Sequence, residues 1–350
     1  MACAQSKNRS LGVSVVVCTF NGSPRIRAVL EALAASKIET PAEVILVDNN
    51  STDDVANKAS AIWQECGRKD IDLRIVLETE QGQAYARRAG VLACKHELVV
   101  FCDDDNLLAE DYLSVATEIL RDDTVGAAGG CGTPIFDGEP SPEFFTYASY
   151  FAVGAQIRTP DDLCKEVVDL SESHDHVLYG AGLVARRADL LNFYRLPFFP
   201  LVSGRKGRDL SSHDDHELCH LVSLAGKRLI YTPRLSFKHL MPKSRLCPEK
   251  IQGQLKATEI SRRRVSKYVA MRRLRTMSSS AIVKEGLRCL LDLLTGRPNR
   301  NRIFMLCAAL NCGFALDADE RKVFDNCRSL TSLVSEPATS LTQHKANAIA

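Results

Sequence analysis

The sequence lacks several features that would assign it to a specialised class of protein. No stretch reaches the roughly 18–20 consecutive apolar residues of a transmembrane helix, and residues 1–10 lack the apolar core of a secretory signal. The 13 cysteines include no Cys-x-x-Cys pair, which favours reduced, buried thiols. The net charge of +2 predicts no general attraction to nucleic acid. We therefore expect a soluble cytoplasmic protein without a nucleic-acid partner.

What is present is the composition of an ordinary globular protein. Hydrophobic residues make up 45% of the chain and charged residues 25%. A chain of 350 residues can build one large domain or two smaller ones, each with a substantial core.

Strand-like and helix-like segments alternate over the first hundred residues. Short apolar runs rich in Val, Ile and Leu are typical of strands that are buried on both faces of a sheet. Amphipathic segments of helical length separate these runs, so the pattern predicts βαβ crossovers and a parallel sheet. The predicted strands cover residues 13–20, 43–48, 72–77 and 98–102.

The loops after these strands carry polar side chains rather than a glycine fingerprint. No G-x-G-x-x-G follows Phe20, which argues against a nicotinamide enzyme. Thr19, Asn21, Asp48 and Asn50 stand there instead. Asp48 has two explanations: it binds a nucleobase or ribose, or it caps the helix that follows.

Three consecutive carboxylates end the fourth predicted strand. We call Asp103, Asp104 and Asp105 the acid triplet. Open α/β sheets bind ligands at the carboxyl ends of their strands, and Mg²⁺ or Mn²⁺ commonly bridges carboxylates to substrate phosphates. The alternative is a solvated acidic turn that caps the next helix.

In order and spacing, these segments resemble the family 2 glycosyltransferases. The resemblance rests on residues 13–21, residues 47–53, residues 82–90 with Arg87, and the Asp103-x-Asp105 pattern. It implies the GT-A fold, a Rossmann-like, mainly parallel α/β sheet flanked by helices. The implied domain covers residues 11–245, with a nucleotide-sugar half (11–125, the donor half) and an acceptor half (126–245).

The resemblance also implies roles for individual residues. Asp105 and Asp103 would hold Mg²⁺ or Mn²⁺, with His239 as a third ligand, and an imidazole suits Mn²⁺ better than Mg²⁺. The spacing of the histidines at positions 213, 216, 220 and 239 fits no zinc site. The residues implied to bind the nucleotide sugar are Thr19, Phe20, Asn21, Asp48, Asn50, Gly82, Arg87, Asp103 and Asp104.

A second acidic stretch, residues 211–219, resembles the family's acidic motif at the start of the acceptor-side helix. The resemblance implies that Asp215 is the catalytic base, with Asp214 as the alternative, and that Glu217 binds the acceptor. The same residues also read as a capping box of Ser212 and Asp215, which is compatible with catalysis. Two short strands are expected after it, on either side of Pro233.

Residues 246–328 predict a basic, helical extension, and the composition of residues 329–350 predicts disorder. Residues 256–275 hold eight Lys/Arg and one acidic residue. Such a helix either packs on the catalytic domain or contacts an anionic lipid surface or lipid-diphosphate acceptor. The apolar segments 281–294 and 303–316 either lie in a membrane interface or form a helical cap or a homodimer contact.

The sequence thus predicts an inverting, metal-dependent transferase. Its donor would be a nucleoside-diphosphate sugar, with uracil as the default base. Its acceptor would be a saccharide, free or lipid-linked, in cell-surface polysaccharide assembly at the inner face of the plasma membrane. The alternatives are an inactive nucleotide- or glycan-binding protein and a sugar nucleotidyltransferase, although residues 21–24 lack the latter's Gly-rich basic loop.

Overall fold

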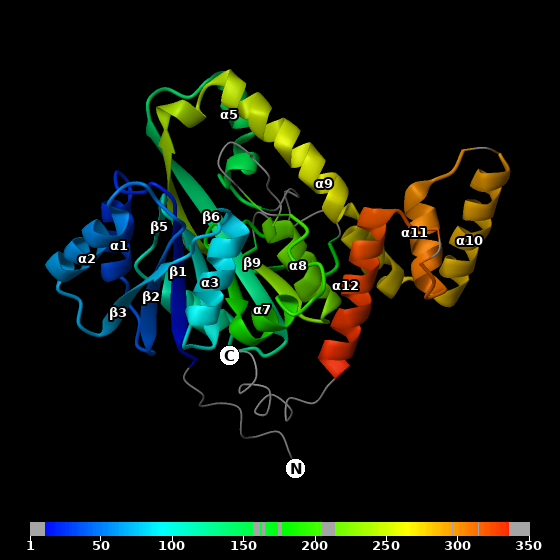
Figure 1. The fold of residues 1–350 in the computed structure, drawn as a ribbon, viewed down its shortest axis with the longest axis horizontal. Helices are drawn as coiled ribbons and strands as arrows, with labels where there is room; N and C mark the ends of the chain where they lie inside the picture. Colours follow the sequence, from blue (N-terminus) through cyan, green and yellow to red (C-terminus); the bar gives the residue numbers. More distant parts are fainter. Residues whose placement is uncertain are drawn as a thin grey trace, which may run out of the picture.

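A single mixed sheet organises the part of the chain that the structure describes (Figure 1). Its strands follow the order β3-β2-β1-β4-β8-β6-β9-β5, and β7 pairs with β9 beside this path. The computed structural model describes residues 11–156, 162, 165–173, 177–202, 204, 214–295, 297–313 and 315–335.

The donor half forms the parallel side of this sheet, as predicted. Thr19 pairs with Asp48 across β1 and β2, so both strands end at the same edge. Neighbouring residues of one strand enter different apolar clusters: Val15 packs with α1 and α2, whereas Val16 packs with α3. Burial on both faces explains why these strands are continuously apolar. The elements are β1 (Val13–Thr19), α1 (Ile26–Ala34), β2 (Ala42–Asp48), α2 (Val55–Cys66), β3 (Ile71–Leu77), α3 (Gln83–Ala93) and β4 (Leu98–Asp103).

The acceptor half adds antiparallel and long strands to the sheet. β8 pairs antiparallel with both β4 and β6, and β6 runs parallel to β9 as far as the pair Asp137–Pro242. The remaining elements up to residue 245 begin with two that still belong to residues 11–125, β5 (Asn106–Leu108) and α4 (Tyr112–Ile119). They continue with β6 (Val125–Asp137), α5 (Pro142–Thr146), η1 (Ala148–Phe151), β7 (Val168–Asp169), β8 (Val184–Arg186), α7 (Arg187–Phe193), α8 (Asp214–Leu224), β9 (Arg228–Pro242) and η2 (Lys243–Arg245).

The two short strands expected around Pro233 are one continuous strand, β9. The pairing with β6 passes from Gly129–Tyr231 to Cys131–Ser236, so residues 232–235 lie in a register shift. A proline has no N–H to donate, and such an irregularity accommodates it without ending the strand.

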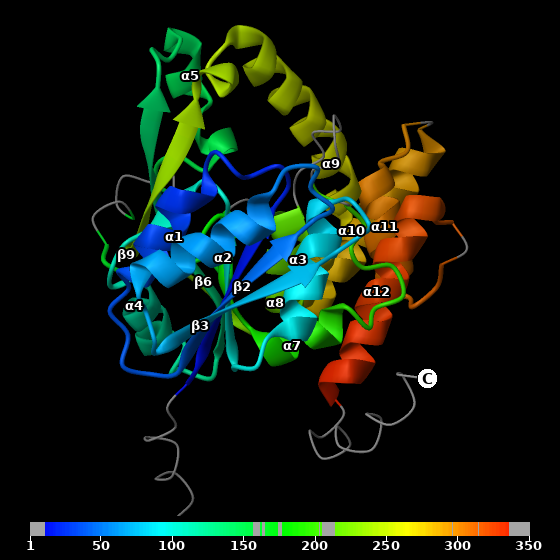
Figure 2. The ribbon, with the colours of Figure 1, turned by 60° about the vertical axis from the view of Figure 1, so that its left-hand side comes forward.

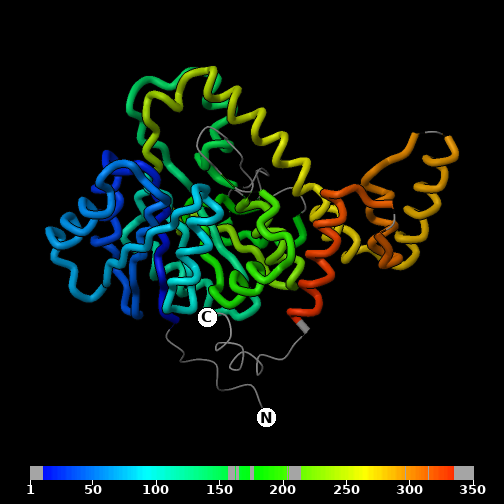
Figure 3. The backbone as a smooth tube through the Cα atoms, viewed as in Figure 1, coloured from blue at the N-terminus to red at the C-terminus, as the bar shows by residue number. Residues whose placement is uncertain are grey.

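The C-terminal extension consists of α9 (Pro248–Thr276), α10 (Ser279–Leu294), α11 (Arg300–Ala309) and α12 (Ala318–Ser335). Figure 2 shows α9 crossing from α5 toward α12, and Figure 3 shows α10 and α11 projecting beyond α12. Within the described residues, no helix is long and apolar enough to cross a membrane.

The disorder predicted from residue 329 is wrong for residues 329–335, which continue α12. Leu330 is 2% exposed and belongs to the same apolar cluster as α8 and α9, so burial stabilises this last part of the helix. The predicted N-terminal tail (1–10) and residues 336–350 lie outside the described residues.

Candidate active site

A cavity of about 1290 Å³ opens at the carboxyl ends of the parallel strands. This is the position at which open α/β sheets bind ligands. Residues of the donor half, the acceptor half and α9 line it together. The predicted site residues among them are Thr19, Phe20, Gly82, Arg87, Asp103, Asp104, Asp105, Asp214, Asp215 and His239.

Three predicted nucleotide-binding residues shape loops and do not line this cavity. Asn21 and Asn50 adopt positive φ angles of 53° and 61°, a conformation that asparagine tolerates better than most residues. The Asn21 side chain accepts a hydrogen bond from the Thr52 N–H at 2.8 Å. Asp48 accepts one from the Ser51 N–H at 2.9 Å, a contact within the loop and not a cap of α2, whose N-cap residue is Asp54.

Glu217 was predicted to bind the acceptor, but its side chain is fully buried. Its carboxylate accepts hydrogen bonds from the Tyr268 hydroxyl at 3.0 Å and the Leu201 N–H at 2.9 Å. Burial raises the pKa of Glu217 to about 8, against the opposing effect of these hydrogen bonds. The residue therefore joins α8 to α9 and is not available to an acceptor.

Each carboxylate of the acid triplet lies beside a different arginine. The sequence predicted a compensating positive charge here but named a metal ion for it, and the arginines come from distant parts of the chain. The pairs are Asp103–Arg87, Asp104–Arg25 and Asp105–Arg245, with N–O distances of 3.6, 2.7 and 2.8 Å.

Asp104 is held within the donor half. It accepts a hydrogen bond from the Thr19 hydroxyl at 2.7 Å and pairs with Arg25. Burial raises the pKa of Asp104, although Arg25 and Thr19 both act to lower it. Gly22 lies directly against this group, because a Cβ there would stand 2.0 Å from the Thr19 hydroxyl and 2.5 Å from the Asp104 carboxylate.

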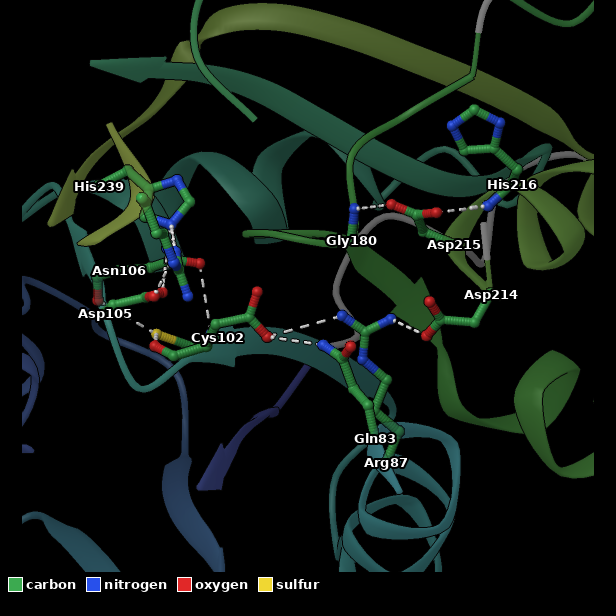
Figure 4. A network of polar contacts seen from close by, with 12 residues as sticks. Gln83, Arg87, Cys102, Asp105, Asn106, Gly180, Asp214, Asp215, His216 and His239 are labelled. Atoms are coloured by element: carbon green, nitrogen blue, oxygen red, sulfur yellow. Dashed lines mark hydrogen bonds and ion pairs between the residues drawn. The ribbon is translucent and has the colours of Figure 1, made fainter. Parts of the chain in front are cut away.

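Asp105 and His239 form the part of the cavity that best fits a divalent cation. They are 3% and 6% exposed, and the His239 Nε2 lies 3.3 Å from the Asp105 carboxylate (Figure 4). The His239 Nδ1 is buried without a hydrogen-bond partner. One carboxylate and one imidazole can hold Mg²⁺ or Mn²⁺ when substrate oxygens and water complete the shell.

The other predicted metal ligand, Asp103, is turned away from this pair. Its carboxylate faces the Gln83 amide at 3.2 Å and Arg87. In the described part of the chain, no three His, Cys, Asp or Glu side chains are grouped to hold a metal. Arg245 lies 3.2 Å from the His239 Nε2 as well as beside Asp105, so its guanidinium stands next to both candidate ligands.

Arg87 joins the acid triplet to the second acidic stretch. Its guanidinium lies 2.6 Å from Asp214 and faces the Phe101 ring at 5.1 Å (Figure 4). Burial alone would lower the pKa of Arg87, but Asp214 and Asp103 raise it, so the side chain stays charged. Asp214 is therefore neutralised by an ion pair with a buried arginine.

Asp215 lies on the acceptor side of the same cavity. One carboxylate oxygen accepts a hydrogen bond from the Gly180 N–H at 2.7 Å, and the other accepts one from the His216 N–H at 2.8 Å (Figure 4). A Cβ on residue 180 would lie 2.7 Å from the Arg87 guanidinium, so an alanine there would have to displace that group. Burial lowers the pKa of His216 to about 4, which keeps its ring neutral at pH 7. Ser212, of the predicted capping box, lies outside the described residues.

Sequence reasoning missed the contribution of α9 to the cavity wall. The helix packs on the catalytic domain, as one of the two explanations held, but it also presents polar side chains to the cavity. Arg262 and Arg263 both pair with Glu259 at 3.2 Å, so this wall carries more positive than negative charge. The lining residues of α9 include Gln254, Thr258, Glu259, Arg262, Arg263, Ser266 and Arg273.

Sequence reasoning also missed Arg25 and Asn49. The Asn49 side chain accepts a hydrogen bond from the Gly82 N–H at 2.7 Å. Gly82 has a φ of 144°, which a residue with a Cβ rarely adopts, and this explains the glycine at the start of α3. A polar residue directly after a strand was the available signal for Asn49, whereas Arg25 carried none.

Comparisons with known proteins agree with this architecture. Residues 14–156 match the family model described as glycosyl transferase family 2. The putative glycosyltransferase EpsH of Bacillus subtilis (strain 168) is 27% identical over 112 residues, which cover 32% of this chain and 31% of EpsH. The chain thus matches less than a third of the length of this curated relative.

Solved structures show the fold. GalNAc-T7 with UDP, GalNAc and Mn²⁺ superposes with a TM-score of 0.53 at 13% identity, over 97% of this chain and 58% of that one. The mannosyltransferase PcManGT from Pyrobaculum calidifontis, in complex with GDP-Man and Mn²⁺, gives 0.49 at 19% identity over 89% of each chain. The GT-A fold is confirmed, and residues 14–156 carry the resemblance to the family 2 glycosyltransferases that the sequence predicted.

Proposed function

We propose that this protein is an inverting glycosyltransferase that moves a sugar from a nucleoside diphosphate to a hydroxyl group of an acceptor. One observation carries the proposal: Asp105 of the donor half and Asp215 of the acceptor half line the same cavity. A transferase needs a site for the leaving diphosphate and a base for the acceptor within reach of one anomeric carbon. The match to the family model over residues 14–156 supports the same activity.

Asp215 is the proposed base. In an inverting transfer, the acceptor oxygen attacks the anomeric carbon from the face opposite the departing nucleotide. The acceptor O–H proton passes to the carboxylate, the new C–O bond forms, and the bond to the phosphate oxygen breaks with its electron pair. Asp215 lies in the first turn of α8 and lines the cavity. Asp214 is less suited to this role because Arg87 already pairs with it.

Asp105 and His239 are the residues proposed to hold Mg²⁺ or Mn²⁺. When bound, such a cation neutralises charge that develops on the leaving diphosphate. Arg245 stands beside both residues and supplies a fixed positive charge at the same place. The GalNAc-T7 structure holds UDP and Mn²⁺, which supports a nucleotide and a divalent cation as ligands of this cavity.

Thr19 and Phe20 are proposed to contact the nucleotide, since both line the cavity at the end of β1. Phe20 is 41% exposed, so its ring is available for stacking. Uracil is the proposed nucleobase of the donor nucleotide sugar. The proposed acceptor is a saccharide, free or linked to a lipid carrier, in surface polysaccharide assembly. The arginines of α9 suit an acceptor that carries phosphate groups.

The test is donor turnover, measured as release of nucleoside diphosphate from a panel of UDP-, GDP- and dTDP-sugars with Mn²⁺. We expect EDTA, Asp105→Ala and Asp215→Asn each to lower turnover strongly. The control is Asp72→Asn, an exposed aspartate on β3 that does not line the cavity.

Unchanged turnover in EDTA and in both variants would refute the mechanism. Metal-dependent binding of UDP without turnover of any sugar would favour a binding protein that keeps the fold but lacks the reaction.

A further inference from the structure

The hairpin formed by α10 and α11 stands away from the catalytic body (Figures 1 and 3). α10 packs on α11 through its inner face, where Gly286 lies against Leu306 and Cys289 is 1% exposed. In Figure 1 no other described element lies over its outer face.

That outer face is strongly apolar. Five side chains recur at helical spacing (i, i+4, i+7, i+8, i+11) and form one stripe along α10. We call them the α10 stripe. Between 53% and 76% of each side chain is exposed, whereas folded proteins rarely leave such a contiguous patch uncovered. The members are Val283, Leu287, Leu290, Leu291 and Leu294.

Basic residues outnumber acidic ones beside this stripe. Lys284 and Arg288 share a helix face with Leu291 at i, i+4 and i+7, and both are exposed. Glu285 and Asp292 are bound to Arg302 of α11, at 3.0 and 2.5 Å, and Glu285 also pairs with Arg288 at 2.5 Å. Lys284 and Arg297 add positive charge to this group, so the segment next to the apolar side chains is positive overall.

We propose that α10 docks onto an anionic lipid surface. The stripe would enter the boundary between headgroups and acyl chains, while Lys284, Arg288 and Arg297 would lie among the headgroups. This arrangement, with an apolar face and basic flanks, is typical of helices that lie in the membrane plane. Residues 279–313 hold five Lys/Arg and two acidic residues, so a second copy would meet like charge.

The position of the hairpin gives this docking a role. Asn301, in the first turn of α11, lines the catalytic cavity and accepts a hydrogen bond from Lys267 of α9 at 2.7 Å. The hairpin would therefore join a membrane bound by α10 to the wall of the cavity through α11. The docking itself does not depend on the proposed transferase activity.

The experiment is co-sedimentation of the full chain with vesicles of phosphatidylcholine, with or without about 30% phosphatidylglycerol. We expect binding to the anionic vesicles only. Leu287→Glu/Leu291→Glu should weaken this binding about 100-fold or more, because two leucines no longer enter the bilayer. Substitution of Lys284, Arg288 and Arg297 by glutamine should weaken it about fivefold for each charge removed.

The matched control is Leu77→Glu/Leu92→Glu, which changes two leucines that are 65% and 55% exposed on β3 and α3. This variant should bind vesicles like the unmodified protein. Failure of the unmodified protein to bind, or equal binding by the α10 variant, would overturn the proposal. A dimer in light scattering that the α10 variant dissociates, without vesicle binding, would assign the stripe to a second copy. Donor turnover is not part of this readout, so the two proposals fail separately.

Discussion

The two acidic stretches of this protein differ in how the fold arranges their carboxylates. In the acid triplet at the end of β4, all three side chains line the cavity, and each lies beside its own arginine. In the stretch that opens α8, Asp214 and Asp215 line the cavity, but Glu217 is buried in the core.

The difference follows from backbone geometry. A helix turns by about 100° per residue, so Glu217, two positions after Asp215, points to roughly the opposite face of α8. At the end of a strand, the chain leaves the sheet, and neighbouring side chains can diverge around one opening. Consecutive acids in a sequence therefore do not establish a shared metal site, and each side chain has to be placed by its partners.

Replacement of Asp215, the proposed catalytic base, should have the largest effect of all the changes. Comparison with Asp214 should show which of the two aspartates takes the acceptor proton. We expect Asp215→Asn to lower kcat by about 10²- to 10⁴-fold with little change in the KM for the donor. Asp214→Asn should cost less than about a tenth of that effect, because Arg87 already neutralises this carboxylate. Steady-state kinetics of both variants gives the ranking, and the reverse order would transfer the base role to Asp214.

Removal of Arg87, which joins the acid triplet to the second acidic stretch, should lower the stability of the protein. Arg87→Met leaves Asp103 and Asp214 without their cation inside the protein, and we expect a loss of about 3–5 kcal/mol in the free energy of unfolding. Urea denaturation measures it. Adding Asp214→Asn to this variant should recover part of the loss. Arg25→Met, which removes an arginine with 33% side-chain exposure, should cost less. Equal losses would show that burial does not distinguish the two pairs.

The two glycines that touch these acids should be sensitive to a single methyl group. Gly180→Ala and Gly22→Ala each place a Cβ within 3.0 Å of a polar group of the site, and we expect about 1–3 kcal/mol of destabilisation from each. Thermal unfolding checks this. In the control, Gly286→Ala on α10, the nearest side-chain atom is 3.5 Å away, and the helix should gain up to about 1 kcal/mol. A stable Gly180→Ala variant would mean that Arg87 can shift without cost.

The last prediction concerns Glu217 and depends on pH. Its folded-state pKa of about 8 lies above the ordinary value of 4.5, so the folded protein retains a proton that the unfolded chain loses. This contribution is fully present below about pH 4.5 and is lost as the pH rises through 8. Glu217→Gln should therefore become more stable relative to the unmodified protein between pH 6 and pH 9. Parallel stability curves over that interval would contradict the assignment of a protonated Glu217.

The sequence was sufficient for the donor half because its signals are local. Continuous apolar runs define β1, β2 and β4, a run interrupted by Asp72 and Arg74 defines β3, and strand ends define Thr19 and the acid triplet. Asp48 and Asn50 occupy the same kind of position, but only contacts with neighbouring residues reveal that they stabilise a loop. Position in the sequence alone could not distinguish strand-end residues that line the cavity from those that do not.

The features of the site that the sequence did not predict depend on contacts between residues far apart in the chain. Arg25 reaches Asp104 across 79 positions, and Arg87 reaches Asp214 across 127. No local pattern encodes these pairs. The direction of Glu217 likewise depends on where α9 packs, because Tyr268 of that helix holds its carboxylate. The basic composition of α9 was visible, but not its place in the cavity wall.

The position of α9 in the cavity wall limits where the chain can be truncated. A fragment that ends at Arg245, the predicted limit of the catalytic domain, would keep every carboxylate of the cavity except Glu259. It would also lose the hydroxyl of Tyr268 that Glu217 requires, and the apolar neighbours that α9 gives to α8. A fragment made for crystallisation should therefore retain the chain through α12, because α9 forms one wall of the cavity and α12 packs on α9.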